Sequence, residues 1–129
     1  MTSPMKKLSL AVLVVDDDEA SLRALGGIVR AMGTRLTTAA TLAEARACIA
    51  ASLPDVLLAD LHMPDGDGAE LLGEVRGSGC EVIFVTGHAD ERGAENALRS
   101  GARAYLTKPV DVERLWAILE EIEERRAPA

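Results

Sequence analysis

Residues 10–18 read LAVLVVDDD, six apolar residues followed directly by three aspartates. An uninterrupted apolar run of this length is typical of a strand that is buried on both faces, as the strands of parallel sheets are. Leu22, Leu25 and Val29 follow at intervals of three and four residues, which indicates an amphipathic helix, and Gly33 is a natural stop for it. The stretch therefore predicts a buried strand, a turn rich in carboxylates, and a helix.

The same alternation of strand and helix continues along the chain. Short apolar or β-branched segments predict five strands, at residues 10–15, 35–39, 55–59, 82–85 and 102–106. Helical periods lie between these strands and after the last one. One of the helices begins at Thr41, with Glu44 three residues on at the spacing of a capping box.

Two of the predicted helices lie on either side of the last predicted strand in the sequence. The helix at residues 90–100 has a thin apolar stripe of Ala94, Ala97 and Leu98, and it contains Gly93, so it is a candidate moving part. The inner face of the last helix, residues 111–126, is expected to consist of Val112, Leu115, Leu119 and Ile122.

The composition of each strand predicts its place in the sheet. The first, third and fourth strands are apolar throughout, whereas residues 35–39 and 102–106 are mixed, as edge strands are. We therefore predict an α/β fold, a doubly wound five-stranded parallel sheet of order 2-1-3-4-5 in a flavodoxin-like three-layer sandwich. A ligand site is expected beyond the carboxyl ends of the first and third strands.

The length and the charge exclude several classes of protein. A chain of 129 residues is expected to form one domain, with a tail at residues 1–7, the domain at 8–126, and a tail or the start of a linker at 127–129. A net charge of -7 argues against direct nucleic-acid binding. The absence of a long apolar run argues against a membrane span, and two cysteines without metal or redox spacing fit a reducing cytoplasm.

Chemically distinctive residues follow the strands at the predicted ligand edge. Asp16 and Asp17 follow the first strand, Asp60 the third, Thr86 the fourth and Lys108 the fifth. Carboxylates this close repel one another, and a hard divalent cation such as Mg²⁺ relieves the repulsion. Carboxylates beside Mg²⁺, an amine and a hydroxyl are suited to phosphoryl transfer onto an aspartate.

The motifs at these strand ends resemble those of the receiver domain of two-component response regulators, including the chemotaxis-regulator type. The resemblance extends over about residues 8–125 and rests on VVDDD at 14–18, DLHMP at 60–64, DG at 67–68, VTG at 85–87 and YLTKP at 105–109. It implies that Asp60 is the phosphoacceptor. It also implies that Mg²⁺ is bound by Asp17 directly, by Asp16 through water, by Asp60, and by the backbone carbonyl of His62, with Mn²⁺ as the alternative ion.

The resemblance assigns roles to the remaining site residues. Thr86 and Lys108 would bind the phosphoryl group, and Gly87 would leave room for it. Thr86 and Tyr105 would form the switch, and the peptide before Pro109 would be cis. His62 and His88 would flank the path of the hydrolytic water and tune dephosphorylation, with a pH dependence near about 6–7. An alternative is that the two histidines favour Mn²⁺ or Zn²⁺ over Mg²⁺.

The same resemblance implies a bacterial cytoplasmic signalling switch that catalyses only its own phosphorylation and dephosphorylation. Its phosphate would come from a sensor histidine kinase or a phosphotransfer protein. A downstream protein or output domain would bind the face formed by residues 90–100, 102–106 and 111–126. A phosphorylation-dependent homodimer is an alternative. The chain is then either a stand-alone receiver or a piece of a longer protein.

Other interpretations compete with this one. A phosphatase of the haloacid dehalogenase type would also use Asp16-x-Asp18, a threonine and a lysine, and a receiver-like module that has lost phosphorylation is a second rival. A nucleotide-binding domain is disfavoured, because the sequence contains neither of the glycine motifs that bind phosphates in such domains. Further residues are assigned structural roles: Asp18 as a helix cap, Asp65 and Asp67 as turn formers, and Trp116, Cys48 and Cys80 as packing residues.

Overall fold

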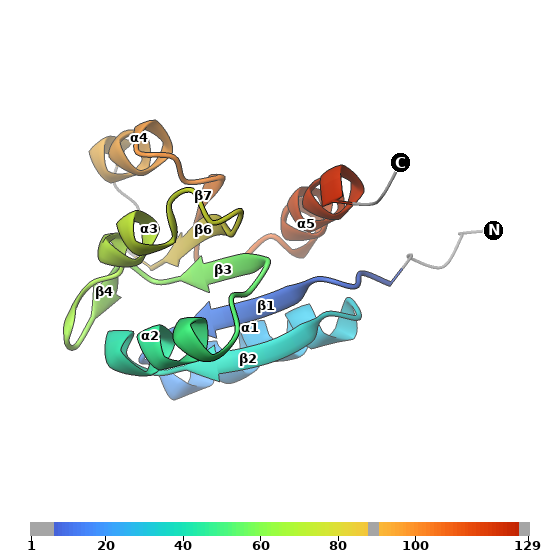
Figure 1. Cartoon of the computed structure of the whole chain (residues 1–129), viewed down its shortest axis with the longest axis horizontal. Coiled ribbons are helices and arrows are strands. Elements are labelled where there is room, and N and C mark those ends of the chain that lie inside the picture. Colours follow the sequence, from blue (N-terminus) through green and yellow to red (C-terminus); the bar gives the residue numbers. More distant parts are fainter. Residues whose placement is uncertain (1–6, 88–90, 127–129) are drawn as a thin grey trace.

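A five-stranded parallel sheet forms the middle layer of the molecule (Figure 1). The computed structural model describes residues 7–87 and 91–126. The strands are β1 (Ala11–Val15), β2 (Arg35–Ala39), β3 (Val56–Ala59), β6 (Glu81–Thr86) and β7 (Ala104–Thr107). Their order is β2-β1-β3-β6-β7, so the predicted order 2-1-3-4-5 is confirmed, with β6 and β7 as the fourth and fifth strands.

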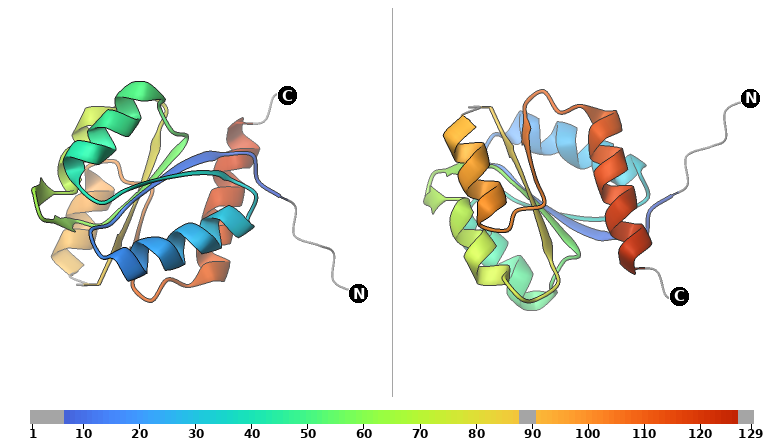
Figure 2. Two further views of the ribbon diagram at one scale, coloured as in Figure 1. Left: turned by 90° about the horizontal axis from the view of Figure 1, so that it is seen from below. Right: turned by 90° about the horizontal axis from the view of Figure 1, so that it is seen from above.

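Helices cover both faces of this sheet (Figure 2). The helices are α1 (Glu19–Ala31), α2 (Leu42–Ala51), α3 (Ala69–Val75), α4 (Glu91–Arg99) and α5 (Val112–Arg126). One apolar cluster joins α1 and α5 to the sheet, and a second joins α2, α3 and α4 to the other face. The fold is therefore a three-layer sandwich.

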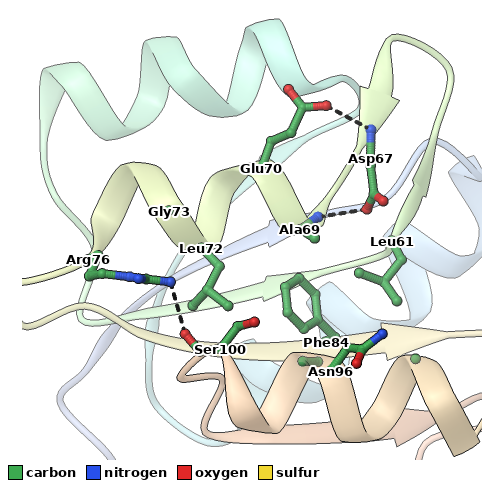
Figure 3. A pocket seen from close by; sticks show the side chains of 12 residues that line it. Leu61, Asp67, Ala69, Glu70, Leu72, Gly73, Arg76, Phe84, Asn96 and Ser100 are labelled. Carbon is green, nitrogen blue, oxygen red and sulfur yellow. Dashed lines mark hydrogen bonds between the residues drawn. The ribbon is translucent and has the colours of Figure 1, made fainter.

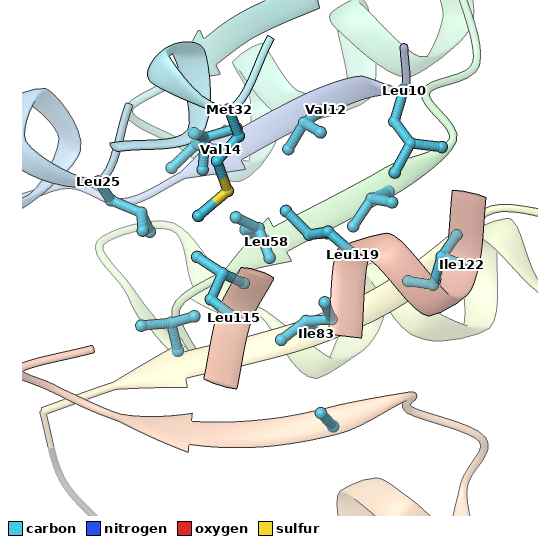
Figure 4. Packing of buried hydrophobic residues seen from close by; sticks show 14 of the residues in the cluster. Leu10, Val12, Val14, Leu25, Met32, Leu58, Ile83, Leu115, Leu119 and Ile122 are labelled. Carbon is cyan, nitrogen blue, oxygen red and sulfur yellow. The ribbon is translucent and has the colours of Figure 1, made fainter. Parts of the chain in front are cut away.

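Alternate side chains of each inner strand enter different clusters, which explains the continuous apolar run in β1. Val12 and Val14 pack under α1 and α5 (Figure 4), whereas Leu13 and Val15 pack under the opposite helices. All four are at most 1 % exposed. The edge strand β2 has three exposed residues and one half-buried residue among its five, as its mixed composition predicts.

The helix caps agree with the sequence, with one difference. Asp18 accepts a hydrogen bond from the backbone N–H of Ala20, and Thr41 accepts one from Glu44 at 3.0 Å. The carboxylate of Glu44 accepts a bond from Ala40, the residue before the cap, instead of from Thr41 itself. The cap is confirmed, and the reciprocal arm of the capping box is shifted by one residue.

Two expectations about buried side chains are wrong. Leu98 is 50 % exposed because α4 rests on the sheet through the small side chain of Ala97. Val112 is 42 % exposed because it is the first residue of α5, at the end of the buried stripe that Leu115 begins. Trp116 packs half-buried against the cluster under α1 and α5, as predicted.

The loop after β3 contains a small hairpin that the sequence does not predict. Its strands are β4 (His62–Met63) and β5 (Gly66–Asp67), which pair in antiparallel fashion. The hairpin lies at the edge of the sheet toward which the arrowheads of β1, β2 and β3 point (Figure 1). None of the described helices is long and apolar enough to cross a membrane.

Candidate functional site

The parallel ladder continues one residue beyond the strands and brings the distinctive residues to one edge. The N–H of Asp60 donates to the carbonyl of Val15 at 3.0 Å, and the N–H of Lys108 donates to the carbonyl of Thr86 at 2.9 Å. Asp16 follows β1, Asp60 follows β3, Thr86 ends β6, and Lys108 follows β7. The structure therefore brings these four predicted site residues together. The Lys108–Pro109 peptide is cis, as the resemblance implies.

The ammonium of Lys108 lies between two buried carboxylates. Its Nζ donates to Oδ2 of Asp16 at 2.5 Å and to Oδ2 of Asp60 at 3.1 Å. Asp16 is 2 % exposed and Asp60 is 8 % exposed. Burial works to lower the pKa of Lys108, but the hydrogen bonds to Asp16 and Asp60 outweigh it and raise that pKa above its usual value. The amine is therefore charged at neutral pH.

The second oxygen of each carboxylate is held by the backbone. Oδ1 of Asp16 accepts a bond from the N–H of Asp18 at 2.9 Å, and Oδ1 of Asp60 accepts one from the N–H of His62 at 3.0 Å. Each carboxylate thus has a donor on both oxygens, one from the backbone two residues on and one from Lys108. Both side chains are oriented before any ligand arrives.

The donor set at this edge fits Mg²⁺ by its chemistry. Asp17 is exposed beside buried Asp16, so three carboxylates share the edge with the single ammonium of Lys108. Within residues 7–87 and 91–126, no three carboxylate, imidazole or thiol side chains are grouped closely enough to hold a metal ion. Mg²⁺ does not need such a group, because it retains several waters and is commonly bound by one or two carboxylates.

Thr86 and Gly87, the predicted phosphate-binding residues, lie at the end of β6, and Tyr105, the second predicted switch residue, lies in β7. Thr86 is fully buried at the end of β6, and a Cβ atom added at Gly87 would meet no heavy atom within 4 Å. Tyr105 is half-buried in β7, opposite Phe84 in the ladder. His62 begins the hairpin and is exposed, and His88 lies outside the described residues. The predicted pairing of the two histidines at the site is therefore not tested.

Gly68 closes the loop onto the phosphoacceptor candidate. Its N–H donates to the carbonyl of Leu61 at 2.8 Å, and a Cβ at this position would lie 2.1 Å from the carbonyl oxygen of Asp60. No side chain fits there without movement of the backbone. In the sequence Gly68 is only part of a motif, whereas the close approach that requires glycine is visible only in three dimensions.

Asp65 has a role that the sequence does not predict. Its carboxylate accepts bonds from the N–H groups of Leu42 at 2.9 Å and Ala43 at 3.0 Å, at the start of α2. These bonds, that from Leu42 above all, lower the pKa of Asp65. Asp65 is thus more than a turn former, because it caps a helix that begins 23 residues earlier in the chain. Asp67 does act locally and accepts a bond from the N–H of Ala69 at 2.9 Å.

A cavity of about 360 Å³ lies between α3 and α4, next to this loop (Figure 3). Leu61, Leu72 and Phe84 line it, and Arg76 donates to the carbonyl of Ser100 at 3.0 Å at its rim. The cavity leaves α4 incompletely packed against its neighbour. Because Ala97 is also the one buried residue of α4, this helix packs weakly against the sheet.

Comparison with known proteins gives consistent matches. The family model described as the response regulator receiver domain matches residues 12–120. An uncharacterised 14.6 kDa protein of Leptolyngbya boryana is 38% identical over 114 residues, which is 85% of this chain and 87% of that protein. The DNA-binding transcriptional regulator NtrC of Escherichia coli K12 is 38% identical over 111 residues, which is 84% of this chain but 24% of NtrC.

Solved structures agree with these matches. The beryllofluoride-activated NtrC4 receiver domain, solved as a dimer in solution, superimposes with a TM-score of 0.82 at 34% sequence identity. The match covers 91% of this chain and 98% of that chain.

Lys108→Met tests the shared ammonium. Removing one member of a buried ion pair costs about 3–5 kcal/mol, and because Lys108 is 24% exposed we expect a smaller loss, about 1–3 kcal/mol in the free energy of unfolding. Urea denaturation measures it. Arg23→Met, which removes an exposed pair with Glu19, is the control and should cost less than about 1 kcal/mol. Equal losses in the two variants would contradict the assignment.

The pH dependence of the Lys108→Met loss follows from the raised pKa. A group whose pKa is raised by folding contributes stability below its unfolded value, here about 10.5, and loses that contribution as the pH rises through the folded value. The difference between the native chain and Lys108→Met should therefore stay constant from about pH 7 to about pH 9. A difference that disappears within that interval would show that the amine is not held as described.

Gly68→Ala tests the close approach to Asp60. The new methyl group would meet backbone atoms that cannot give way, so we expect a loss of about 1–3 kcal/mol in the free energy of unfolding. The amide NMR signals of Leu61 and His62 should shift. Gly73→Ala in α3 is the control, since its methyl group would meet no heavy atom within 4 Å. Loss of stability in the control but not in Gly68→Ala would contradict the packing described.

Proposed function

The chain belongs to the response regulator receiver domain family, and on this premise we propose that it is a phosphorylation switch whose phosphoacceptor is Asp60. The observation that carries the proposal is the sharing of one ammonium by two buried carboxylates, Asp16 and Asp60, beside the buried hydroxyl of Thr86. Among these, Asp60 is the acceptor because β3 pairs with β6, which ends in Thr86, whereas β1 lies one strand further away.

The proposed reaction is transfer of a phosphoryl group from a phosphohistidine of a sensor kinase or phosphotransfer protein. A carboxylate oxygen of Asp60 forms a bond to phosphorus, the bond from phosphorus to the imidazole nitrogen breaks, and the electron pair of that bond remains on the imidazole. The side chain of Asp60 loses its own charge and gains that of the phosphoryl oxygens. Lys108 and the hydroxyl of Thr86 then bind those oxygens.

A divalent cation completes the proposed site. Asp16, Asp17, Asp60 and the backbone carbonyl of His62 would hold Mg²⁺, or Mn²⁺ as the alternative, and the ion would supply positive charge to the phosphoryl oxygens. The chain's own residues orient the acceptor: His62 N–H and Lys108 fix the two oxygens of Asp60 before transfer. Hydrolysis of the same acyl phosphate would return the switch to its resting state, with His62 and His88 tuning the rate.

The proposed output is a change in the face formed by α4, β7 and α5. Movement of Thr86 toward the phosphoryl group would leave space that the ring of Tyr105 enters from the neighbouring strand. The weak packing of α4, with Ala97 as its one buried residue and a cavity beside α3, supports a shift of that helix. A partner protein, an output domain or a second copy of the chain would bind the altered face.

The proposed domain comprises residues 8–126. Leu8 and Leu10 are buried in the cluster under α1 and α5, and Arg126 at the end of α5 contacts the carboxylate of Asp55 at 3.2 Å. The chain spans about a quarter of the length of NtrC. Of the rivals, the dehalogenase-type phosphatase is set aside by the family match. The module without phosphorylation is disfavoured by the assembled acids, hydroxyl and amine.

Acetyl phosphate with Mg²⁺ tests the acceptor. We expect the intact mass of the native chain to increase by one phosphate, because Asp60 is pre-oriented, and we expect no increase after Asp60→Asn or when a chelator is added. Asp55→Asn is the matched control at the opposite end of β3 and should be phosphorylated normally. An adduct on Asp60→Asn, or no adduct on the native chain from acetyl phosphate or phosphorylated kinases, would refute the proposal.

A further inference from the structure

The β4–β5 hairpin is built against the start of α2. Asp65, at its tip, accepts bonds from Leu42 and Ala43, so its carboxylate binds the two free N–H groups of the first turn. Gly66 has a φ of 148°, and a Cβ there would lie 2.9 Å from Cδ1 of Leu42. Hydrogen bonding and close packing are thus two independent observations that the hairpin tip and α2 fit together.

The base of the same hairpin is fixed at the phosphorylation site. The N–H of His62 donates to the carboxylate of Asp60, and Gly68 packs on the carbonyl of Asp60. His62 therefore lies between two anchors, Asp60 at the base and Asp65 at the tip. The hairpin pairs His62 with Asp67 and Met63 with Gly66, so the tip is joined directly to the segment that contains His62.

The capping of α2 explains only part of the role of Asp65. Thr41, the residue directly before α2, already caps the helix, because its hydroxyl accepts a hydrogen bond from the N–H of Glu44. Ala43 is exposed, so water can bind its N–H in place of Asp65, whereas Leu42 is fully buried and its N–H depends on Asp65. The hairpin tip, by contrast, has no other charge-assisted bond to α2 among the described residues. The remaining link between the hairpin and α2 is indirect. Arg46 of α2 pairs with Glu70, and Glu70 accepts a hydrogen bond from the N–H of Asp67. The side chains of Arg46 and Glu70 are 40 % and 53 % exposed.

From this geometry we propose that Asp65 is a positioning residue, which anchors the hairpin to α2 and so holds the backbone of His62 in the place required for Mg²⁺ at Asp60. The inference rests on the proposed function, because the cation belongs to the proposed phosphorylation site. It adds a residue that touches neither cation nor phosphate and that acts through the loop. Groups that hydrogen-bond to a metal ligand typically change the metal affinity by about 10–100-fold, and Asp65, which acts through the loop and not on a ligand directly, should have a smaller effect.

A comparison of Asp65→Ala with Thr41→Ala separates positioning from capping. Both variants remove a side-chain cap from the same helix, but only Asp65→Ala releases the hairpin. Mg²⁺ is titrated into the unphosphorylated chain, and its dissociation constant is read from the amide NMR signals of residues 61–68. We expect it to rise at least about threefold in Asp65→Ala and to be unchanged in Thr41→Ala. The amides of His62 and Gly68 should also exchange faster with solvent in Asp65→Ala alone. Asp65→Asn retains one acceptor oxygen and should be intermediate.

The outcomes distinguish this inference from the function on which it rests. Equal Mg²⁺ affinity in the native chain and Asp65→Ala, equal effects of Asp65→Ala and Thr41→Ala, or no Mg²⁺ binding by the native chain would each overturn the inference. Failure of both acetyl phosphate and phosphorylated kinases to modify the native chain would overturn the proposed function. Because the titration needs no phosphate, the anchoring of the loop is decided in either case.

Discussion

The arrangement of the site depends on one interaction, the sharing of the Lys108 ammonium by the carboxylates of Asp16 and Asp60. Two desolvated carboxylates in neighbouring strands repel each other strongly, and the fold can bury them only with a cation between them. This constraint explains why a lysine must follow β7 and why Asp60 is fixed in orientation. It would also couple Lys108 to the proposed phosphorylation, because a change in the charge of Asp60 would change what Lys108 binds.

The strand order makes this sharing possible. β1, β3, β6 and β7 are consecutive in the sheet, so their carboxyl ends place acid, acid, hydroxyl and amine along one edge. The inner strands are rigid because both of their faces are buried, whereas α4 has a single buried residue, Ala97. A rigid edge beside a weakly held helix suits the proposed switch, since a local change of charge can then move one element without unfolding the rest.

Much of this could be predicted from the sequence, because the deciding patterns are local. The apolar run before Asp16 indicates an inner strand, and the mixed composition of residues 35–39 indicates an edge strand. The contact of Asp65 with α2 and the approach of Gly68 to Asp60 could not be predicted, because each depends on how segments meet after folding. The helical period wrongly places Leu98 and Val112 on inner faces, because it identifies the apolar stripe of a helix without its exact limits. Which edge of the stripe is buried depends on how the helix rests on the sheet.

The edge offers Asp16, Asp17 and Asp60 to the same phosphoryl donor, so identifying the modified carboxylate decides which of the three is the acceptor. Borohydride reduces an aspartyl phosphate to homoserine, and fragmentation of the resulting peptides by mass spectrometry locates the altered residue. We expect homoserine at position 60 alone, beside Lys108 and next to the strand that ends in Thr86. Homoserine at position 16 or 17 would contradict this expectation.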